Sequence, residues 1–112
     1  MANTYKNSIS TITSTGSDEA IYTCPSNATA IINTVFVYNG TGGTGDFTLT
    51  VADTSATSSA KIYFKSSLAA ATTDTVLGSG NVVVLEDSDI LKINTTIQPI
   101  DVTVSVLQIT RA

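Results

Sequence analysis

The sequence is poor in charge and in reactive side chains. Only 12% of its 112 residues are charged, against about 25% in an average soluble domain. It has no histidine, no tryptophan and a single cysteine. Histidine-based acid–base catalysis, Ser–His or Cys–His nucleophile pairs and zinc sites of cysteine and histidine are therefore excluded. We expect a protein that is not an enzyme and that carries no cofactor.

Basic residues are also scarce. The chain has five of them against nine acidic residues, which gives a net charge of −4 and an isoelectric point near 4.3. The five, Lys6, Lys61, Lys65, Lys92 and Arg111, are scattered rather than grouped. A nucleic-acid-binding surface needs a basic stripe, so nucleic acid is not an expected partner.

Long apolar runs are missing, since the longest unbroken ones span four residues. A membrane-spanning helix needs about 20 apolar residues, and the first ten residues lack the basic and apolar regions of a secretory leader. Neither a membrane nor a leader is expected. A lone Cys24 cannot form an internal disulfide, which suits a reducing compartment. We expect it to be a small core residue at a strand end before Pro25.

Hydroxyl and β-branched residues take the place of charge. The chain contains 20 threonines and 13 serines, and its apolar residues recur with period 2 rather than 3.6. Turn residues divide it into short segments. The pattern predicts eight strands: Ser8–Thr13, Ala20–Cys24, Ala30–Asn39, Asp46–Ala52, Ala60–Leu68, Asn81–Leu85, Asp89–Asn94 and Val102–Thr110.

Short strands at this spacing predict an all-β fold of one domain. We expect a single eight-stranded β-sandwich, jelly-roll-like, over residues 17–112. Residues 1–16 form a polar N-terminal arm or first strand, which a neighbouring subunit would hold. Ser66–Thr73, with its three consecutive alanines, is the one segment expected to form a helical turn.

Two of the predicted strands carry apolar residues on both faces. In Ala30–Asn39, Val35 and Val37 share one face while Phe36 and Tyr38 share the other, and the last strand adds Leu107 and Ile109 opposite its valines. Either a loop or the arm covers the second face, or this face is a subunit interface. The interface candidates are Tyr5, Ile9, Ile12, Phe36, Tyr38, Leu107 and Ile109.

Other candidate sites have simpler explanations. Glu86, Asp87 and Asp89 form an acidic cluster without the spacing of an EF-hand, so we expect a turn rather than a calcium site. The tyrosines Tyr5, Tyr22, Tyr38 and Tyr63 could stack against sugars, but they are not clustered in the sequence. Core or interface positions are favoured for them, and no metal site is expected.

Three segments resemble small virion structural proteins of tailed phages, especially marine and cyanobacterial ones. The first runs from Ala20 to Asn39, with Tyr22-Thr23-Cys24-Pro25 followed by an Ile/Val-rich strand ending in asparagine. The second is Val83 to Ile93, a turn with aspartate before a Leu-x-Ile strand, although a glycine expected before that aspartate is absent. The third is the closing strand Asp101 to Ile109. Together they cover most of the chain after Glu19.

The resemblance implies a capsid decoration (cement) protein that binds the outer surface of the major capsid protein lattice. The alternatives are a tail, neck or fibre-associated virion protein and a host-surface carbohydrate-binding module. The implied partners are the major capsid protein or other virion proteins. We also expect a homo-oligomer, with a trimer as one candidate, located in virions assembled in the host cytoplasm.

Overall fold

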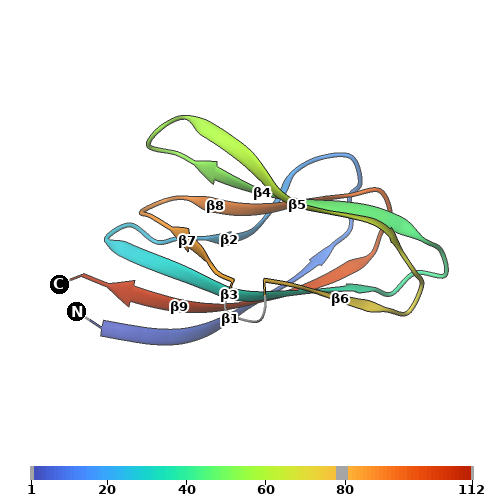
Figure 1. Cartoon of the computed structure of the whole chain (residues 1–112), viewed down its shortest axis with the longest axis horizontal. Coiled ribbons are helices and arrows are strands. Elements are labelled where there is room, and N and C mark those ends of the chain that lie inside the picture. Colours follow the sequence, from blue (N-terminus) through green and yellow to red (C-terminus); the bar gives the residue numbers. More distant parts are fainter. Residues whose placement is uncertain (1, 78–80, 112) are drawn as a thin grey trace.

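The computed structural model describes residues 2–77 and 81–111, which form two antiparallel β-sheets packed face to face (Figure 1). The molecule is elongated, 47 × 27 × 22 Å. Within the described ranges, the structure contains no helix of the length and apolarity that crossing a membrane requires. The predicted all-β sandwich is confirmed.

The strands are distributed in order along the chain. They are β1 (Ala2–Ile12), β2 (Glu19–Thr23), β3 (Ala28–Asn39), β4 (Gly45–Asp53), β5 (Ser58–Leu68), β6 (Thr73–Val76), β7 (Val83–Leu85), β8 (Ile90–Thr95) and β9 (Ile100–Thr110). Sheet A contains β1, β9, β3, β6 and β7, and sheet B contains β2, β8, β4 and β5, in these orders across each sheet.

The two short strands β6 and β7 occupy a single position at the edge of sheet A. β6 pairs with Val35–Tyr38 of β3 and β7 pairs with Ala30–Ile32, both antiparallel. With β6 and β7 in one position, the sheets read 1-9-3-6/7 and 2-8-4-5. This is the two-sheet arrangement of a jelly roll with eight strand positions.

The core lies between the two sheets and is built by alternation. Each strand directs every second side chain inward, so β3 and β9 of sheet A face β4 and β8 of sheet B. The largest of these side chains that are fully buried include Ile32, Val35, Val37, Leu49, Leu91, Ile93, Val102, Val104 and Val106. The valine-rich and isoleucine-rich composition therefore fills one layer about 10 Å thick.

Three expectations from the sequence are corrected. Residues 2–77 and 81–111 form nine strands rather than eight, because Thr73–Val76 forms β6. Ser66–Thr73 does not form a helical turn: β5 continues to Leu68 and a short turn follows. Residues 1–16, expected to be a polar arm or first strand with a strand at Ser8–Thr13, contain the longer strand β1, which pairs with β9 of the same chain from Ala2 to Ile12.

Candidate interaction surface

The outer face of sheet A carries a row of apolar side chains at one register across four strands. Tyr5 of β1 is opposite Leu107 of β9, Leu107 is opposite Ile31 of β3, and Ile31 is opposite Val84 of β7. Directly opposed residues of an antiparallel sheet point to the same face. The four side chains therefore form a continuous strip across the sheet, which we call the apolar row.

A second group of apolar residues lies beside this row. Ile9 and Phe36 both oppose Thr103 of β9, so they fall in one line across the sheet. Ile109 lies two residues beyond Leu107 on the same face of β9. Tyr38 lies two residues beyond Phe36 on β3. The outer face of sheet A thus combines apolar and hydroxyl residues.

Several of these apolar side chains are largely exposed to solvent and do not contribute to the core. Tyr5 is 79% exposed, Ile9 75% and Val84 56%, while Phe36 and Tyr38 on the central strand keep 42% and 37%. The explanation that an arm covers the second face of β3 is wrong, because the first strand lies at the sheet edge. Large exposed apolar groups arranged contiguously mark an interaction surface.

The structure brings together six of the seven residues proposed from the sequence. Tyr5, Ile9, Phe36, Tyr38, Leu107 and Ile109 all lie on the outer face of sheet A. Ile12 does not: it opposes Ile100 and is 5% exposed, inside the core. The reason is the period of the strand, since Ile9 and Ile12 are three residues apart and must point to opposite faces.

Sequence reasoning missed three members of this surface. Ile31 and Val84 complete the apolar row, and Val82, just before β7, is 48% exposed. Alternation could not find Ile31: it lies five residues before Phe36, so period 2 places it on the opposite face, and only the bulge between Ile32 and Thr34 brings both to the outer face. Nor could alternation find Val84, since its orientation depends on the pairing of β7 with β3.

The outer face of sheet B is different in character. Its corresponding row runs from Lys61 on β5 through Thr50 on β4 and Lys92 on β8 to Ala20 on β2. Thr50 is only 7% exposed between the two lysines, whose alkyl stems can cover a strand while their charges remain in water. The aromatic residue of this face, Phe64 on β5, is 61% exposed and lies opposite Thr48.

Two charged groups lie at the ends of sheet A, apart from Lys6 on β1 and Asp74 on β6. At one end, Thr11 Oγ1 donates to Asp101 Oδ1 at 2.9 Å. At the other, the guanidinium of Arg111 pairs with Asp87, which also accepts the Asn27 N–H at 3.2 Å. The Arg111 partner lowers the pKa of Asp87 below its usual value. The apolar row between these ends is free of charged residues.

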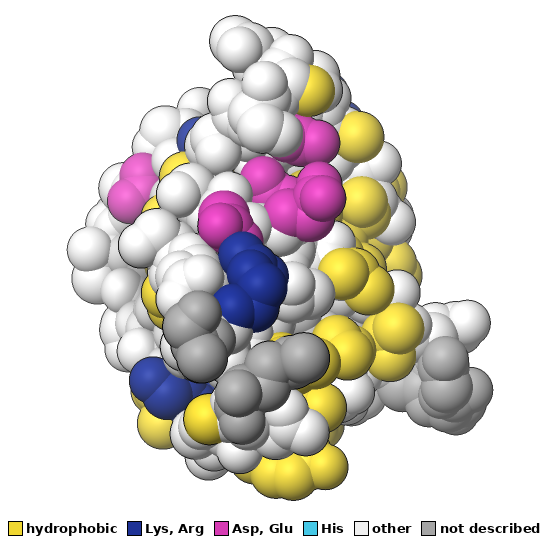
Figure 2. All heavy atoms as spheres, turned by 90° about the vertical axis from the view of Figure 1, so that its left-hand side faces the viewer, with side chains coloured by type: hydrophobic (Ala, Val, Ile, Leu, Met, Phe, Trp, Pro, Cys, Tyr) yellow, Lys and Arg dark blue, Asp and Glu magenta, His cyan; other side chains and the backbone are white. Residues whose placement is uncertain are grey.

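Acidic side chains gather at the end of the molecule that Figure 2 views, next to a basic side chain. Asp53, Glu86 and Asp89 bring carboxylate oxygens within 4.8 Å of one another. Asp89 is 4% exposed and accepts the N–H groups of Glu86 and Thr54, at 3.0 and 3.3 Å. Asp89 therefore ties the turn before β8 to the β4–β5 turn.

Asp53 also stabilises a turn through hydrogen bonds. The sequence pattern did not associate it with the acidic cluster of Glu86, Asp87 and Asp89. Its Oδ1 accepts hydrogen bonds from Ser55 Oγ at 2.8 Å and from the N–H groups of Ser55 and Ala56. These bonds, above all that from the Ser55 hydroxyl, lower the pKa of Asp53. Three donors on one carboxylate oxygen are what a tight turn supplies, so the cluster is explained by turn formation.

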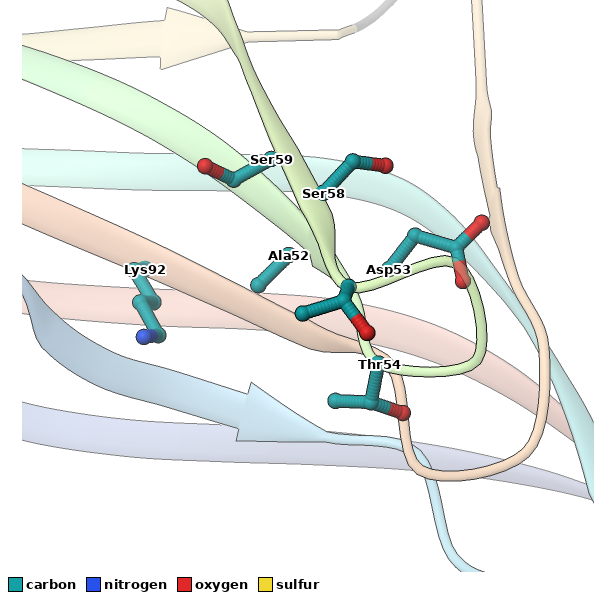
Figure 3. A pocket seen from close by; sticks show the side chains of 7 residues that line it. Ala52, Asp53, Thr54, Ser58, Ser59 and Lys92 are labelled. Carbon is teal, nitrogen blue, oxygen red and sulfur yellow. The ribbon is translucent and has the colours of Figure 1, made fainter.

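A shallow depression of about 360 Å³ lies beside the β4–β5 turn (Figure 3). Its lining residues are Ala52, Asp53, Thr54, Thr57, Ser58, Ser59 and Lys92. In Figure 3 the Lys92 ammonium and the Asp53 carboxylate lie at opposite ends of the depression. It is an open hollow lined by hydroxyl groups, without two facing carboxylates that could act as acid and base.

The four tyrosines do not form one aromatic site. Tyr22 of β2 is buried and its hydroxyl donates to Gln108 Oε1 of β9 at 2.7 Å, and burial raises its pKa to about 12. The Tyr63 hydroxyl donates to Asp74 Oδ2 at 2.7 Å, which raises the pKa of Tyr63. Both contacts tie sheet B to sheet A. Only Tyr5 and Tyr38 reach the outer face of sheet A, and they lie in different rows.

Cys24 lies in the core, as the sequence predicts. It is 1% exposed directly after β2, and its thiol is 3.5 Å from the carbonyl oxygen of Ala28. Burial, followed by the nearby carboxylates of Asp87 and Asp89, raises its pKa. A buried, protonated thiol is a packing group and not a nucleophile.

Comparison with protein-family models, with curated proteins and with solved structures finds no match to this chain.

Proposed function

We propose that this protein is a structural protein of a tailed-phage particle, most specifically a capsid decoration protein that binds the outer surface of the major capsid protein lattice. The observation that carries the binding mode is the apolar row Tyr5–Leu107–Ile31–Val84 on the outer face of sheet A. The sequence resemblance described above supplies the kind of particle. The two arguments are independent of each other.

The fold by itself does not choose among functions. Two-sheet jelly rolls occur in viral capsid proteins and also in lectins, and one fold hosts many activities. The argument therefore rests on the surface. A sugar-binding site needs aromatic side chains grouped beside polar ones in a concavity. Here the hydroxyls of two tyrosines, Tyr22 and Tyr63, bond between the two sheets, and no aromatic residue is among those that line the depression of Figure 3.

The composition supports a role in assembly. A subunit that is enclosed by neighbours needs little charge, because charged residues are depleted at the centre of protein interfaces, where aromatic residues are enriched. The outer face of sheet A follows part of this description: Phe36 is exposed on the inner strand β3, Tyr5 is exposed on the edge strand β1, and the Arg111–Asp87 pair lies at one end. Attachment through an apolar sheet face requires neither a cofactor nor a conformational change.

The test is reconstitution on particles. Heads of the phage that carries this gene, prepared from a deletion strain, would be mixed with the purified chain, sedimented and analysed by cryo-electron microscopy. We expect saturable binding with a stoichiometry fixed by the capsid lattice, with sheet A facing the shell. The matched variants are Leu107→Lys on sheet A, which should weaken binding strongly, and Phe64→Lys on sheet B, which should leave it nearly unchanged.

The same preparation distinguishes the alternatives. Density confined to the tail, neck or fibres would replace decoration by the tail-associated function. Binding to heads that survives Leu107→Lys but is lost with Phe64→Lys would assign the contact to sheet B. Absence of the chain from every part of the particle would overturn the proposal.

A further inference from the structure

We propose that two copies of this chain pair antiparallel along their β1 strands, which joins two A sheets into one continuous sheet about a two-fold axis. The partner is a second copy of the chain, and the surface is the backbone edge of β1 rather than the apolar face. The inference goes beyond the proposed function, since it concerns the protein free in solution and holds whether or not a particle is bound.

β1 differs from the other strands that border the two sheets. Proteins protect exposed sheet edges by short strands, bulges or charged side chains. β6 and β7 have four and three residues, and β2 has five residues with a register shift. β5 is long, but it has two register shifts against β4 and carries Lys61 and Lys65.

β1 is neither short nor interrupted by a bulge, and it carries one charged side chain. It spans 11 residues, pairs with β9 without a register shift, and contains Lys6 as its charged residue. All its side chains from Ala2 to Asn7 are exposed. A long, regular and exposed edge is a template for another strand.

The direction of the unpaired backbone groups follows from the neighbouring strands. Arg111 donates its N–H to the Asn27 carbonyl of the segment before β3. Backbone direction alternates along a strand, so odd-numbered residues of β9 point toward β3 and even-numbered ones toward β1. Even residues of β9 oppose even residues of β1. The odd residues of β1, Asn7 among them, therefore direct N–H and C=O to the exposed edge.

One register uses the whole strand. Antiparallel pairing of Ala2–Ile12 with itself places Asn7 opposite Asn7 of the second copy and Tyr5 opposite its Ile9. The odd residues then exchange N–H···O=C bonds in reciprocal pairs. Tyr5 and Ile9, which are 79% and 75% exposed in the single chain, become cross-strand neighbours, an aromatic–aliphatic pairing that stabilises sheets.

The charges are compatible with this register. Lys6 is opposite Ser8 of the second copy, and no two lysines oppose each other. A shift of two residues toward the N-terminus would instead place Lys6 opposite Lys6, which is unfavourable, and would shorten the overlap. The pairing is two-fold and closed, so it predicts a dimer and not the trimer considered from the sequence.

Single-cysteine cross-linking of the full chain tests the register. Asn7→Cys places two thiols at opposed positions whose Cα atoms are about 5.5 Å apart. Asn3→Cys is the matched control: it lies on the same strand and the same face, but residues 3 of the two copies would be about 27 Å apart at 3.4 Å per residue. Under mild oxidation we expect a covalent dimer from Asn7→Cys and none from Asn3→Cys or from the native chain, whose Cys24 is buried.

Sedimentation equilibrium gives the second measurement. Asn7→Pro removes an outward N–H while leaving the β1–β9 bonds intact, because proline is accepted at such edge positions. We expect the native chain to show a monomer–dimer equilibrium and Asn7→Pro to weaken it at least tenfold, with an unchanged circular dichroism spectrum.

A native chain that stays monomeric and an Asn7→Cys variant that does not cross-link would overturn the inference. So would equal cross-linking of Asn7→Cys and Asn3→Cys, since this would indicate random collision or another interface. Neither result bears on attachment of sheet A to particles, which is measured with heads and not with the chain alone.

Discussion

Across sheet A one row of the outer face is apolar on all four strands that it crosses, whereas the corresponding row across sheet B holds two lysines. The inner faces of the same sheets are alike: both contribute fully buried aliphatic side chains to one core. Folding of the single chain requires apolar side chains only on the inner faces, which form the core. Under the proposed function, this difference between the outer faces reflects what each one contacts: water for sheet B and another protein surface for sheet A.

The largest expected effect is a difference in the free energy of unfolding between substitutions on the two faces of β1. Ile12→Ala should lower the free energy of unfolding by about 3 kcal/mol, because it opens a cavity in the core. Ile9→Ala, three residues away on the outer face of sheet A, should change it by less than about 0.5 kcal/mol. Urea titration monitored by circular dichroism measures both. Equal losses would show that the outer face contributes to folding, and the comparison between the sheets would then fail.

The second effect concerns binding. In the particle assay, Leu107→Lys should weaken binding by about 30-fold or more, which corresponds to the roughly 2 kcal/mol of a central contact residue. Phe64→Lys on sheet B should stay within about twofold. The pair is informative because Phe64 is the more exposed of the two, at 61%. A greater loss with Phe64→Lys would mean that exposure, and not position on sheet A, decides binding.

The third effect tests the inner faces, where a polar contact joins the two sheets. Tyr22→Phe leaves the buried Gln108 Oε1 without its donor, at a cost of about 1 kcal/mol at neutral pH. The fold raises the pKa of Tyr22 from 10.0 to about 12. A raised pKa gives stability that is complete below pH 10 and is lost as the pH rises toward 12, because the unfolded chain ionises first.

Urea midpoints between pH 9 and pH 12 measure this dependence. The native chain should lose stability over this range and Tyr22→Phe should lose less, with a residual slope from Tyr63, whose pKa is also raised. Tyr63→Phe is the matched control, because Tyr63 also donates its hydroxyl from one sheet to the other, to Asp74 of β6, but is less buried than Tyr22. Identical slopes in the native chain and in Tyr22→Phe would show that Tyr22 ionises freely in the fold.

The alternation of the sequence was sufficient to predict the class of fold and most of sheet A's outer face. Phe36 and Leu107 were assigned correctly because period 2 fixes their side of a strand. The same rule would have removed Ile12 from the surface, since it cannot share a face with Ile9. The predicted strand Ser8–Thr13 already contained both residues, and the error came from not applying period 2 to this pair.

The remaining differences depend on contacts between distant segments. β6 contains Thr73, Asp74 and Thr75 with a single apolar residue, Val76, so no local pattern marks it as a strand, and it forms by pairing with β3. The polar half of β1 is likewise a strand because β9 provides a partner. Asp53 meets Glu86 and Asp89 only through the packing of two turns.

The smallest effect should come from making sheet B resemble sheet A. Lys61→Val with Lys92→Val would leave Thr50 between two β-branched residues and extend an apolar strip from β5 to β8. We expect unchanged folding, stronger binding of a hydrophobic dye and precipitation at a lower ammonium sulfate concentration. The matched control, Lys61→Gln with Lys92→Gln, changes the net charge from −4 by the same amount but stays polar, and should behave like the native chain. If the glutamine pair behaves like the valine pair, net charge and not the polarity of one face keeps sheet B in solution, and the contrast between the two outer faces loses its physical basis.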